Sequence, residues 1–415
     1  SKSAVSPTLY YYAFCVRRSI PAPCYAARAG TAAMIAAQHF GSISGGKDSQ
    51  AVLCRMVERI ERRGLAAFGN RAPRFLSADN GHENPITLDH IAYLDGWLRQ
   101  RTGLCIETVS ANDVPGLTDA AAFARKRAML REEWSKEKRR TRHKGACNQR
   151  RAAWQAGRLT KGQWLAACEC PVLVSPPVPD HLIDRALELL HPTGIPFLDM
   201  AMLHGRFPGT KTRFCTDETK LIPMMHRKRP LLDAGISVID WIGERADESP
   251  ARAKKPPIQS VRHPSGARKV LYRPIFRWSA ADAFAISERH GLRHNPLYTM
   301  GMSRVGCSTC IMVRKRELRA WAMRFPAEVD RVREWERLVS LVSRRTAISG
   351  APASLLPAPT VPGDPADHGR ATIDRAIAWS RTSRGGRNYD LFLAQEQRDA
   401  DEHGLLCDSE YGLCE

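Results

Sequence analysis

A glycine-rich hexapeptide lies between a short apolar segment and an amphipathic one, and this arrangement limits the folds open to the chain. The hexapeptide, Ser44-Gly45-Gly46-Lys47-Asp48-Ser49, follows the strand-like run His39–Ile43. After it, apolar residues recur at helical spacing: Ala51, Val52, Met56, Val57 and Ile60. Glycines permit a tight turn, and the amides at a helix N-terminus attract phosphate. The pattern predicts a strand–loop–helix unit that binds an anion, to which Lys47 adds a full positive charge.

The same order of elements recurs further along the chain. A second strand is expected over 74–78, followed by the loop Asp79–Pro85 and a helix that begins at Pro85, where the missing N–H has no cost. Further strands are expected over 104–109 and 236–242, and the latter delivers residues 243–249 to its carboxyl end. Alternating strands and helices indicate an α/β fold with a parallel sheet, whose ligands bind at the carboxyl edge.

A loop of the kinase or GTPase type is excluded by one residue. The segment Gly41-x4-Gly46-Lys47 approaches that pattern, but Asp48 stands where a hydroxyl must reach magnesium. A carboxylate beside a triphosphate is a poor substitute for that hydroxyl.

The hexapeptide instead matches the SGGxDS signature of the PP-loop ATP pyrophosphatases. Residues 38–312 resemble the phosphoadenosine phosphosulfate reductase-like branch of that superfamily through Asp79-Asn80-Gly81-His82-Glu83-Asn84-Pro85-x-Thr87, Phe214-Cys215-Thr216 with Lys220 and Pro223, Gly243-x-Arg245-x-Asp247-Glu248-Ser249, Arg273-Pro274-Ile275, Trp278, Asn295-Pro296-Leu297-Tyr298, and Gly301-x-x-Arg304-Val305-Gly306-Cys307-x-x-Cys310. The resemblance implies an adenine nucleotide alpha hydrolase-like parallel sheet with helices on both faces. A basic helical insertion and a C-terminal extension would be added to it.

Departures from the family pattern indicate which chemistry to expect. The reductases carry a degraded loop and a C-terminal Glu-Cys-Gly motif, whereas here the loop is intact and that tripeptide does not occur. An ATP-consuming member is therefore expected, with motifs most similar to the sulfurtransferase of DNA phosphorothioation. Such an enzyme adenylates its substrate, releases pyrophosphate and inserts sulfur. The alternatives are a reductase or sulfate-activating enzyme for a small molecule, and a non-catalytic nucleic-acid-binding metalloprotein.

The resemblance also implies roles for individual residues. ATP and Mg²⁺ would be held by residues 44–49, Asp79 and Arg245, and the catalytic residues would be Lys47, Asp48, Cys215 and Arg245. Asp79 has a helix cap as its structural alternative, and Arg245 a core salt bridge. His82 is expected either to touch a ligand or to stabilise its loop. Three further residues are weighed for lesser roles. Glu248 would orient Arg245, and Arg213 and Lys220 would either neutralise phosphate or lie solvated at the surface.

Cysteines suggest a second centre beside the nucleotide. The pair Cys307-x-x-Cys310 has the spacing that lets two thiolates reach one metal, although a redox pair and two unrelated thiols remain alternatives. The resemblance places Cys215 beside this pair, and three thiolates would hold a [4Fe–4S] cluster, with Zn²⁺ as the competitor. Candidate fourth ligands are Cys168, Cys170, Cys407 and Cys414. Cys54 is expected in the core of the first helix, and Cys15, Cys24 and Cys105 are taken as extension or core residues.

Charge points to a polyanionic partner. The net charge is +20, and residues 125–161 hold 14 basic and 3 acidic residues, which is 14 − 3 = +11. We expect a nucleic acid to bind this segment, with a solvated helical hairpin as the alternative. Trp134 and Trp154 would either stack on bases or pack within helices. A sulfur donor protein such as a cysteine desulfurase is the other expected partner.

The expected organisation has five parts: an N-terminal extension (1–37, with Met34 as a possible functional start), the PP-loop domain (38–312, with the insertion at about 122–178), a helical segment (313–348), a linker (349–369) and a tail (370–415). No apolar run approaches the roughly 20 residues that span a bilayer, so no membrane partner is expected. Twelve cysteines are too sparse for a disulfide scaffold, and a reducing cytoplasm is the expected location.

Overall fold

The computed structural model describes residues 37–141, 150, 152–166, 172–210, 212–356 and 372–381. Within these residues the strands form a six-stranded sheet of order β3-β2-β1-β6-β8-β7 and a separate two-stranded ribbon, β4-β5. The sheet strands are β1 (Gln38–Ser42), β2 (Arg74–Asp79), β3 (Ile106–Ser110), β6 (Val238–Trp241), β7 (Ile258–Arg262) and β8 (Arg268–Tyr272). All neighbours are parallel except β7 and β8, so the predicted parallel sheet is confirmed.

The order of the strands places a crevice at their carboxyl ends. From β1 the chain moves outward through β2 to β3, whereas β6 lies on the other side of β1 and leads to β8 and β7. The direction of winding therefore reverses between β1 and β6. Open α/β sheets bind ligands at this reversal, and here the loops after β1 and β6 meet there.

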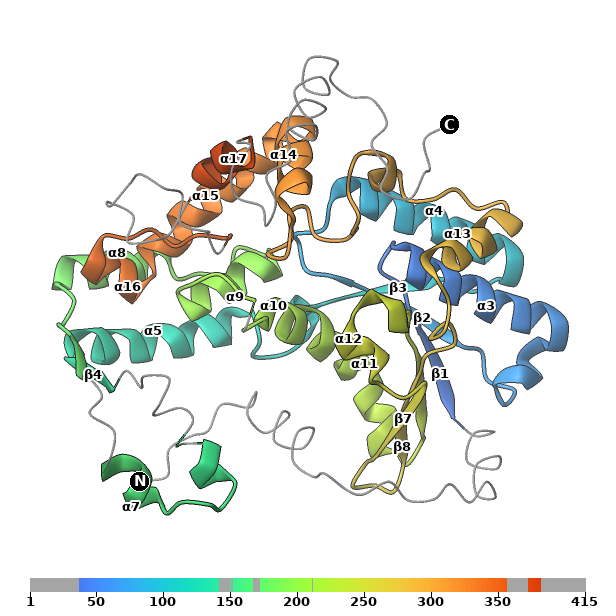
Figure 1. Ribbon diagram of the computed structural model, residues 1–415, viewed down its shortest axis with the longest axis horizontal. Helices are drawn as coiled ribbons and strands as arrows, with labels where there is room; N and C mark the ends of the chain where they lie inside the picture. Colours follow the sequence, from blue (N-terminus) through green and yellow to red (C-terminus); the bar gives the residue numbers. More distant parts are fainter. Residues whose placement is uncertain are drawn as a thin grey trace.

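Helices cover both faces of the sheet, as predicted (Figure 1). One face packs against α3 (Lys47–Arg63), α4 (Pro85–Thr102) and α13 (Ala280–Arg289), and the other against α11 (Ile222–Asp233). Short elements complete this part of the chain: η1 (Gly64–Phe68), η2 (Ala111–Asp113), α10 (Phe214–Thr216), η3 (Asp217–Leu221), η4 (Ala246–Glu248), α12 (Pro250–Ala253) and η5 (Pro296–Thr299).

The start of α4 shows how local sequence sets an element. The Asn84 side chain accepts a hydrogen bond from the Ile86 amide at 3.0 Å, and Pro85 occupies the first helical position. The helix ends at Gly103, whose φ of +73° is left-handed. The predicted start at Pro85 is confirmed.

The insertion differs from the expected helical hairpin. It contains α5 (Ala120–Ser135) and the short α7 (Lys161–Ala166), but β4 (Lys138–Thr141) and β5 (Val172–Ser175) pair as an antiparallel ribbon. The insertion is therefore helical in part, as predicted, and its antiparallel ribbon was not predicted. Four consecutive residue pairs, from Lys138–Ser175 to Thr141–Val172, join the two strands of this ribbon. The paired residues are more than 30 positions apart in the sequence, so no local periodic pattern predicts the pairing.

A second core lies beside the sheet and is helical. It combines α5 with α8 (Asp180–Leu189), α9 (Pro196–His204), α14 (Lys315–Arg324), α15 (Pro326–Leu341) and α17 (Ile373–Ser380), and α16 (Arg344–Ser349) adjoins it. Figure 1 shows these helices gathered to one side of the sheet.

The segment expected to be a linker contributes to that core. Ala353 and Leu355 are fully buried, although Pro and Ala had indicated an exposed connection over 349–369. The first part of the linker prediction is therefore wrong, because small apolar residues also fill gaps between helices. Residues 357–371 lie outside the described part, as do 1–36 and 382–415. Among the described helices, none combines the length and apolar character needed to cross a membrane.

Candidate active site

The glycine-rich loop connects β1 to α3 at the carboxyl edge of the sheet. Gly45 has a φ of +71°, and a Cβ there would lie 2.8 Å from Thr87 Cγ2, so both conformation and space require glycine. The Ser49 hydroxyl accepts from the Ser44 amide at 3.1 Å and donates to the Gly46 carbonyl at 2.9 Å. The loop is therefore held in shape by its own serine. Lys47 is buried at the first position of α3, beside the helix amides that lack partners within the helix.

Arg245, which follows β6, closes the other side of this loop. Its Nε lies 2.5 Å from Asp48 Oδ1, and its Nη1 lies 2.5 Å from Asp247 Oδ2. Burial lowers the pKa of Arg245, but the charges of Asp48 and Asp247 raise it by more, so its pKa lies above the usual value. The guanidinium thus joins the loops after β1 and β6, and its predicted contact with phosphate stays a prediction.

Asp79 ends β2 and lies at the same edge. Its Oδ1 accepts from the Gly81 amide at 2.8 Å, and the helix cap is Asn84, so the capping alternative for Asp79 is wrong. The carboxylate is half-buried at a strand end, a position compatible with magnesium or ribose.

His82 stabilises its loop, the second of its two predicted roles. It is 1% exposed, its Nε2 lies 3.0 Å from the Thr309 carbonyl oxygen, and its ring packs against Phe197 and Trp335. Burial lowers its pKa to about 3, so the imidazole is neutral at physiological pH. It holds the cysteine-containing turn against the loop after β2.

Two of the predicted thiols, Cys215 and Cys307, lie near a lysine. Cys307 forms a β-bridge with Glu83, and its Sγ accepts from the Asn80 amide group at 3.6 Å. Glu83 pairs with Lys220, which lies on the π-helical turn η3 directly after Cys215. Burial lowers the pKa of Lys220, whereas Cys307 and Glu83 raise it by more, so the ammonium is retained.

The thiols influence one another electrostatically. Burial and the charge of Cys310 raise the pKa of Cys215, and burial raises that of Cys307 to about 12 although Lys220 opposes it. Cys307 is therefore a protonated thiol at neutral pH. Across the described residues, no three Cys, His, Asp or Glu side chains form a group able to hold a metal ion. The donor set does not by itself fit a metal, and we assign no step to one. The four candidate fourth ligands lie outside the described residues.

A single segment joins the phosphate loop to the thiols. The Asn295 side-chain amide donates to the Gly45 carbonyl at 3.1 Å, and the Tyr298 hydroxyl accepts from the Lys47 amide at 3.0 Å. Further along, the Gly306 carbonyl accepts from the Asn84 amide at 2.8 Å, immediately before Cys307. Residues 295–310 thus contact the glycine-rich loop at one end and carry thiols at the other.

Three residues of the candidate site were not predicted from the sequence: Asp247, Glu83 and Asn80. Asp247 and Glu83 stood inside the motifs but had been given no role. No sequence spacing relates Glu83 to Lys220, which is 137 positions away, whereas Asp247 lies only two positions from Arg245. Glu248 does not orient the Arg245 guanidinium, since it accepts from the Arg245 backbone amide at 2.9 Å.

Several single-residue expectations are decided by burial and ring contacts. Trp134 is 3% exposed and packs in the helical core, so base stacking is wrong for it. Trp154 stacks on Trp164, with ring centroids 5.2 Å apart. Cys54 is buried as predicted, whereas Cys105 is exposed, so the extension-or-core expectation is wrong for Cys105.

Part of the insertion's positive charge is neutralised locally. Arg131 pairs with Asp184 of α8, and Lys136 and Arg139 pair with Glu132 and Glu137. Exposed pairs of this kind contribute little to stability. Of the 14 basic residues of 125–161, only Arg142, Lys144 and Arg151 fall outside the described part of the chain.

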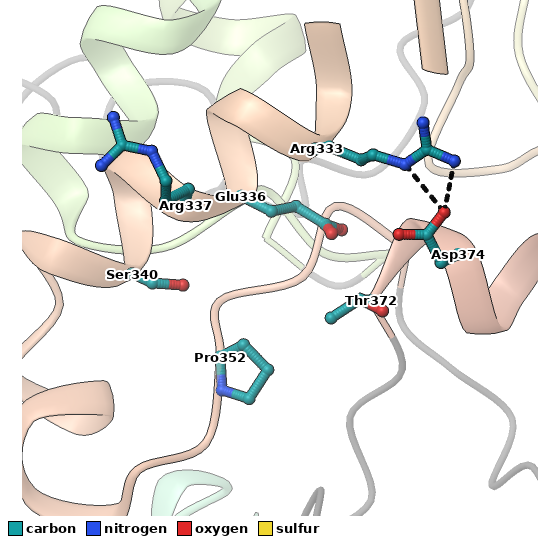
Figure 2. A pocket seen from close by; sticks show the side chains of 7 residues that line it. All are labelled: Arg333, Glu336, Arg337, Ser340, Pro352, Thr372 and Asp374. Atoms are coloured by element: carbon teal, nitrogen blue, oxygen red, sulfur yellow. Dashed lines mark hydrogen bonds and ion pairs between the residues drawn. The ribbon is translucent and has the colours of Figure 1, made fainter. Parts of the chain in front are cut away.

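A second hollow lies among the C-terminal helices. Figure 2 shows this pocket of about 270 Å³ between α15 and the start of α17. Arg333 pairs with Asp374, and Glu336 accepts hydrogen bonds from the amides of Leu355 and Ile373. These polar side chains of the pocket therefore already have partners within the protein. The pocket is a poor candidate for a nucleotide site, because it lies among the C-terminal helices, away from the glycine-rich loop at the start of α3 (Figure 1).

Glu336 makes the docking of α17 sensitive to pH. Burial raises its pKa to about 7, so between pH 4.5 and 7 the unfolded chain ionises and the folded chain does not. Stability should fall as pH rises through this window, by up to about 3 kcal/mol. We expect Glu336→Gln to flatten the pH dependence of urea denaturation between pH 5 and 8. An unchanged slope would show that Glu336 is ionised in the folded protein.

Taken together, the loop after β1, the arginine after β6 and the reversal of the strand order define an α/β protein of the nucleotide-binding class. Comparison with known proteins narrows this class. Residues 209–313, which include Cys215, Arg245 and the Cys307 turn, match the family described as "Phosphoadenosine phosphosulfate reductase domain". The match begins after the phosphate loop.

Two curated proteins are similar in sequence. The "Uncharacterized 37.8 kDa protein in gpa 5'region" of Escherichia phage 186 is 35% identical over 390 residues, which are 90% of this chain and 96% of that protein. The adenosine 5'-phosphosulfate reductase of Streptomyces coelicolor is 34% identical over 87 residues, 21% of this chain and 36% of that protein. The chain therefore belongs to the family of the phage protein, and its residues 209–313 match the phosphoadenosine phosphosulfate reductase domain.

Among solved structures, the phosphoadenylyl-sulfate reductase of Candida auris in its phosphate complex covers 65% of this chain and 81% of its own, with 15% identity and a TM-score of 0.30. That score is too low to support a conclusion.

Proposed function

We propose that the protein is an ATP-dependent, AMP- and pyrophosphate-forming enzyme that adenylates a substrate before sulfur insertion. The observation that carries the proposal is the segment 295–310, which contacts the phosphate loop through Asn295 and Tyr298 and then presents Cys307 and Cys310. A nucleotide bound at the glycine-rich loop and a sulfur-bearing group at the cysteine turn would thus both contact residues 295–310.

In this proposal the loop 44–49 binds the phosphates of Mg²⁺-bound ATP. A substrate oxygen attacks the α-phosphorus, the bond to the β-phosphate oxygen breaks, and pyrophosphate leaves. Lys47 and Arg245 neutralise the charge that develops on the leaving group, and catalysis comes mainly from this neutralisation and from positioning. Asp48 and Asp247 hold Arg245 in place for that role.

The second half-reaction replaces AMP by sulfur. A donor protein such as a cysteine desulfurase would transfer sulfane sulfur to one of the thiols of Cys215, Cys307 and Cys310, forming a persulfide. Its terminal sulfur would displace AMP from the substrate, and a second thiol of the set would release the sulfurated product by forming a disulfide with the first. A cellular dithiol would then reduce that disulfide before the next turnover. Lys220 lies near Cys215 and Cys307 and retains its positive charge, which favours an anionic sulfur species. Within the protein, the steps above are assigned only to this chain's own residues, because the described side chains do not form a metal-binding group.

A nucleic acid is the proposed substrate, because residues 125–161 carry a net +11. Phosphate contacts release counterions, so binding should weaken steeply with salt. Reduction of a small sulfate ester remains the second candidate. It is favoured by the family match and by the similarity to the Streptomyces coelicolor reductase.

The test is pyrophosphate release from ATP, with and without DNA, RNA or sulfate. We expect release stimulated by nucleic acid, and a drop of about 100-fold or more in Lys47→Ala, because a charge that stabilises the leaving group is lost. Lys254→Ala is the matched control, since Lys254 is an exposed lysine just after α12 and should behave as wild type.

Each outcome separates the candidates. Sulfite production from an adenylyl sulfate, with no pyrophosphate from ATP under any condition, would support the reductase and contradict the adenylating enzyme. Equal rates in Lys47→Ala and wild type would place the activity outside this loop.

A further inference from the structure

Tyr298 occupies a position where a phosphate oxygen is expected. Its hydroxyl accepts a hydrogen bond from the Lys47 amide at 3.0 Å, and that amide opens α3 directly after the glycine turn. The first amides of a helix have no acceptor within the helix and are the donors that phosphates use. A phenol oxygen on this amide thus competes with a pyrophosphate oxygen for one donor.

The Tyr298 side chain is buried against the glycine-rich loop. Tyr298 is 3% exposed, and its ring centroid lies 5.3 Å from the Lys47 Nζ. A Cβ added at Gly46 would lie 3.5 Å from the Tyr298 hydroxyl oxygen and 3.3 Å from Val305 Cγ2. The hydroxyl, the glycine turn and Val305 therefore pack directly against one another, so the hydroxyl cannot move without its own segment.

That segment leads to the thiols by a short path. Tyr298 lies in η5, which is capped by Asn295, and the amides of Met300 and Met302 both donate to the Leu297 carbonyl at 3.1 Å. Val305 and Cys307 follow within a few residues, where the backbone is fastened to the loop after β2. A displacement of Tyr298 is thus transmitted through one compact turn to Cys307 and Cys310.

We infer that Tyr298 is a positioning residue that couples occupation of the phosphate loop to the cysteine turn. Without nucleotide, its hydroxyl holds the Lys47 amide and keeps the turn closed. Pyrophosphate takes that amide, the hydroxyl is displaced, and the turn opens so that Cys310 becomes more accessible. This inference rests on the proposed function, because it assigns the loop to pyrophosphate. It would ensure that sulfur chemistry begins only when nucleotide is bound.

The experiment measures pyrophosphate affinity and thiol reactivity together in the full chain. Mg²⁺-pyrophosphate is titrated by calorimetry, and the alkylation rate of the peptide that contains Cys307 and Cys310 is followed by mass spectrometry. In wild type we expect pyrophosphate to raise the alkylation rate at Cys310 at least threefold. The exposed Cys105 is an internal reference and should keep a constant rate.

Tyr298→Phe removes the hydroxyl and keeps the ring. Because the hydroxyl no longer competes for the Lys47 amide, we expect pyrophosphate to bind about twofold to tenfold more tightly, the range for one hydrogen bond. Alkylation of Cys310 should be fast without pyrophosphate and unchanged by it. Tyr93→Phe is the matched control, since the Tyr93 hydroxyl accepts from the Arg293 amide at 3.2 Å, and it should behave as wild type.

The failures are distinguishable. A wild-type chain that binds pyrophosphate but shows no change at Cys310 overturns the coupling alone, and so does a Tyr298→Phe chain with wild-type or weaker affinity. A wild-type chain that binds no pyrophosphate overturns the proposed function together with the coupling. The wild-type comparison stands even if the variant folds poorly.

Discussion

Replacement of Gly243 by alanine should disable the phosphate loop. A Cβ at this position would lie 2.7 Å from the carbonyl carbon and oxygen of Asp48 and 2.9 Å from the Ser49 amide nitrogen. These are backbone atoms of the first turn of α3, and they have no rotamer by which to avoid the contact. We expect a loss of about 1–3 kcal/mol in unfolding free energy. Activity should fall roughly 100-fold, because catalytic groups would shift by a substantial fraction of 1 Å.

Gly96→Ala is the matched control for that substitution. Gly96 lies within α4, a Cβ added there would meet no atom within 4 Å, and its φ is not positive. Alanine there should stabilise the helix by about 0.5–1 kcal/mol. Urea denaturation and the pyrophosphate assay together test the pair of variants. Wild-type activity in Gly243→Ala would mean that the loops after β1 and β6 do not need their close approach.

Loss of Lys228 should produce the largest change in stability. Its Nζ lies 2.5 Å from Asp240 Oδ1, and both side chains are about 4% exposed between α11 and the central strand β6. Lys228→Met leaves Asp240 as an uncompensated buried charge, which costs about 3–5 kcal/mol. The expected result is a marked shift of the urea midpoint to lower concentration.

A second substitution tests that explanation. Adding Asp240→Val to Lys228→Met removes the unpaired buried carboxylate. The two apolar side chains would then pack beside Phe40, over whose ring the Lys228 ammonium lies in the wild-type protein. Most of the lost stability should return, since apolar replacements of a buried pair are often neutral. Arg99→Met, which breaks an exposed pair with Asp95, should leave the midpoint unchanged. No recovery in the double variant would show that Lys228 acts through packing.

Much of the sheet was predictable because its signals are local. The loop 44–49 and the start of α4 at Pro85 depend on turn chemistry and capping within a few residues, and both were found as expected. The four expected strands differ from β1, β2, β3 and β6 by at most two residues at each end, whereas β7 and β8 were not predicted. The ribbon of β4 and β5 was missed because its pairing joins residues more than 30 positions apart.

For the site, sequence identified the residues but not their contacts. Asp48 and Arg245 were both assigned to the nucleotide, yet in the structure they pair with each other across 197 positions. Likewise Lys220 was expected to face phosphate or solvent and instead pairs with Glu83, 137 positions away. Charge and spacing do not reveal which opposite charge a side chain will meet once the chain has folded.

The amino-acid sequence alone thus determined the strand–loop–helix units, the family and the residues that form the candidate site. Hydrophobic period, capping residues and glycine turns act over a few residues and are written locally. Only the tertiary structure decided that Tyr298 lies on the Lys47 amide, that Gly243 touches the first turn of α3, and that small residues of the expected linker are buried. Those contacts arise from packing between distant segments, where shape and burial select the partner and no short-range pattern records the choice.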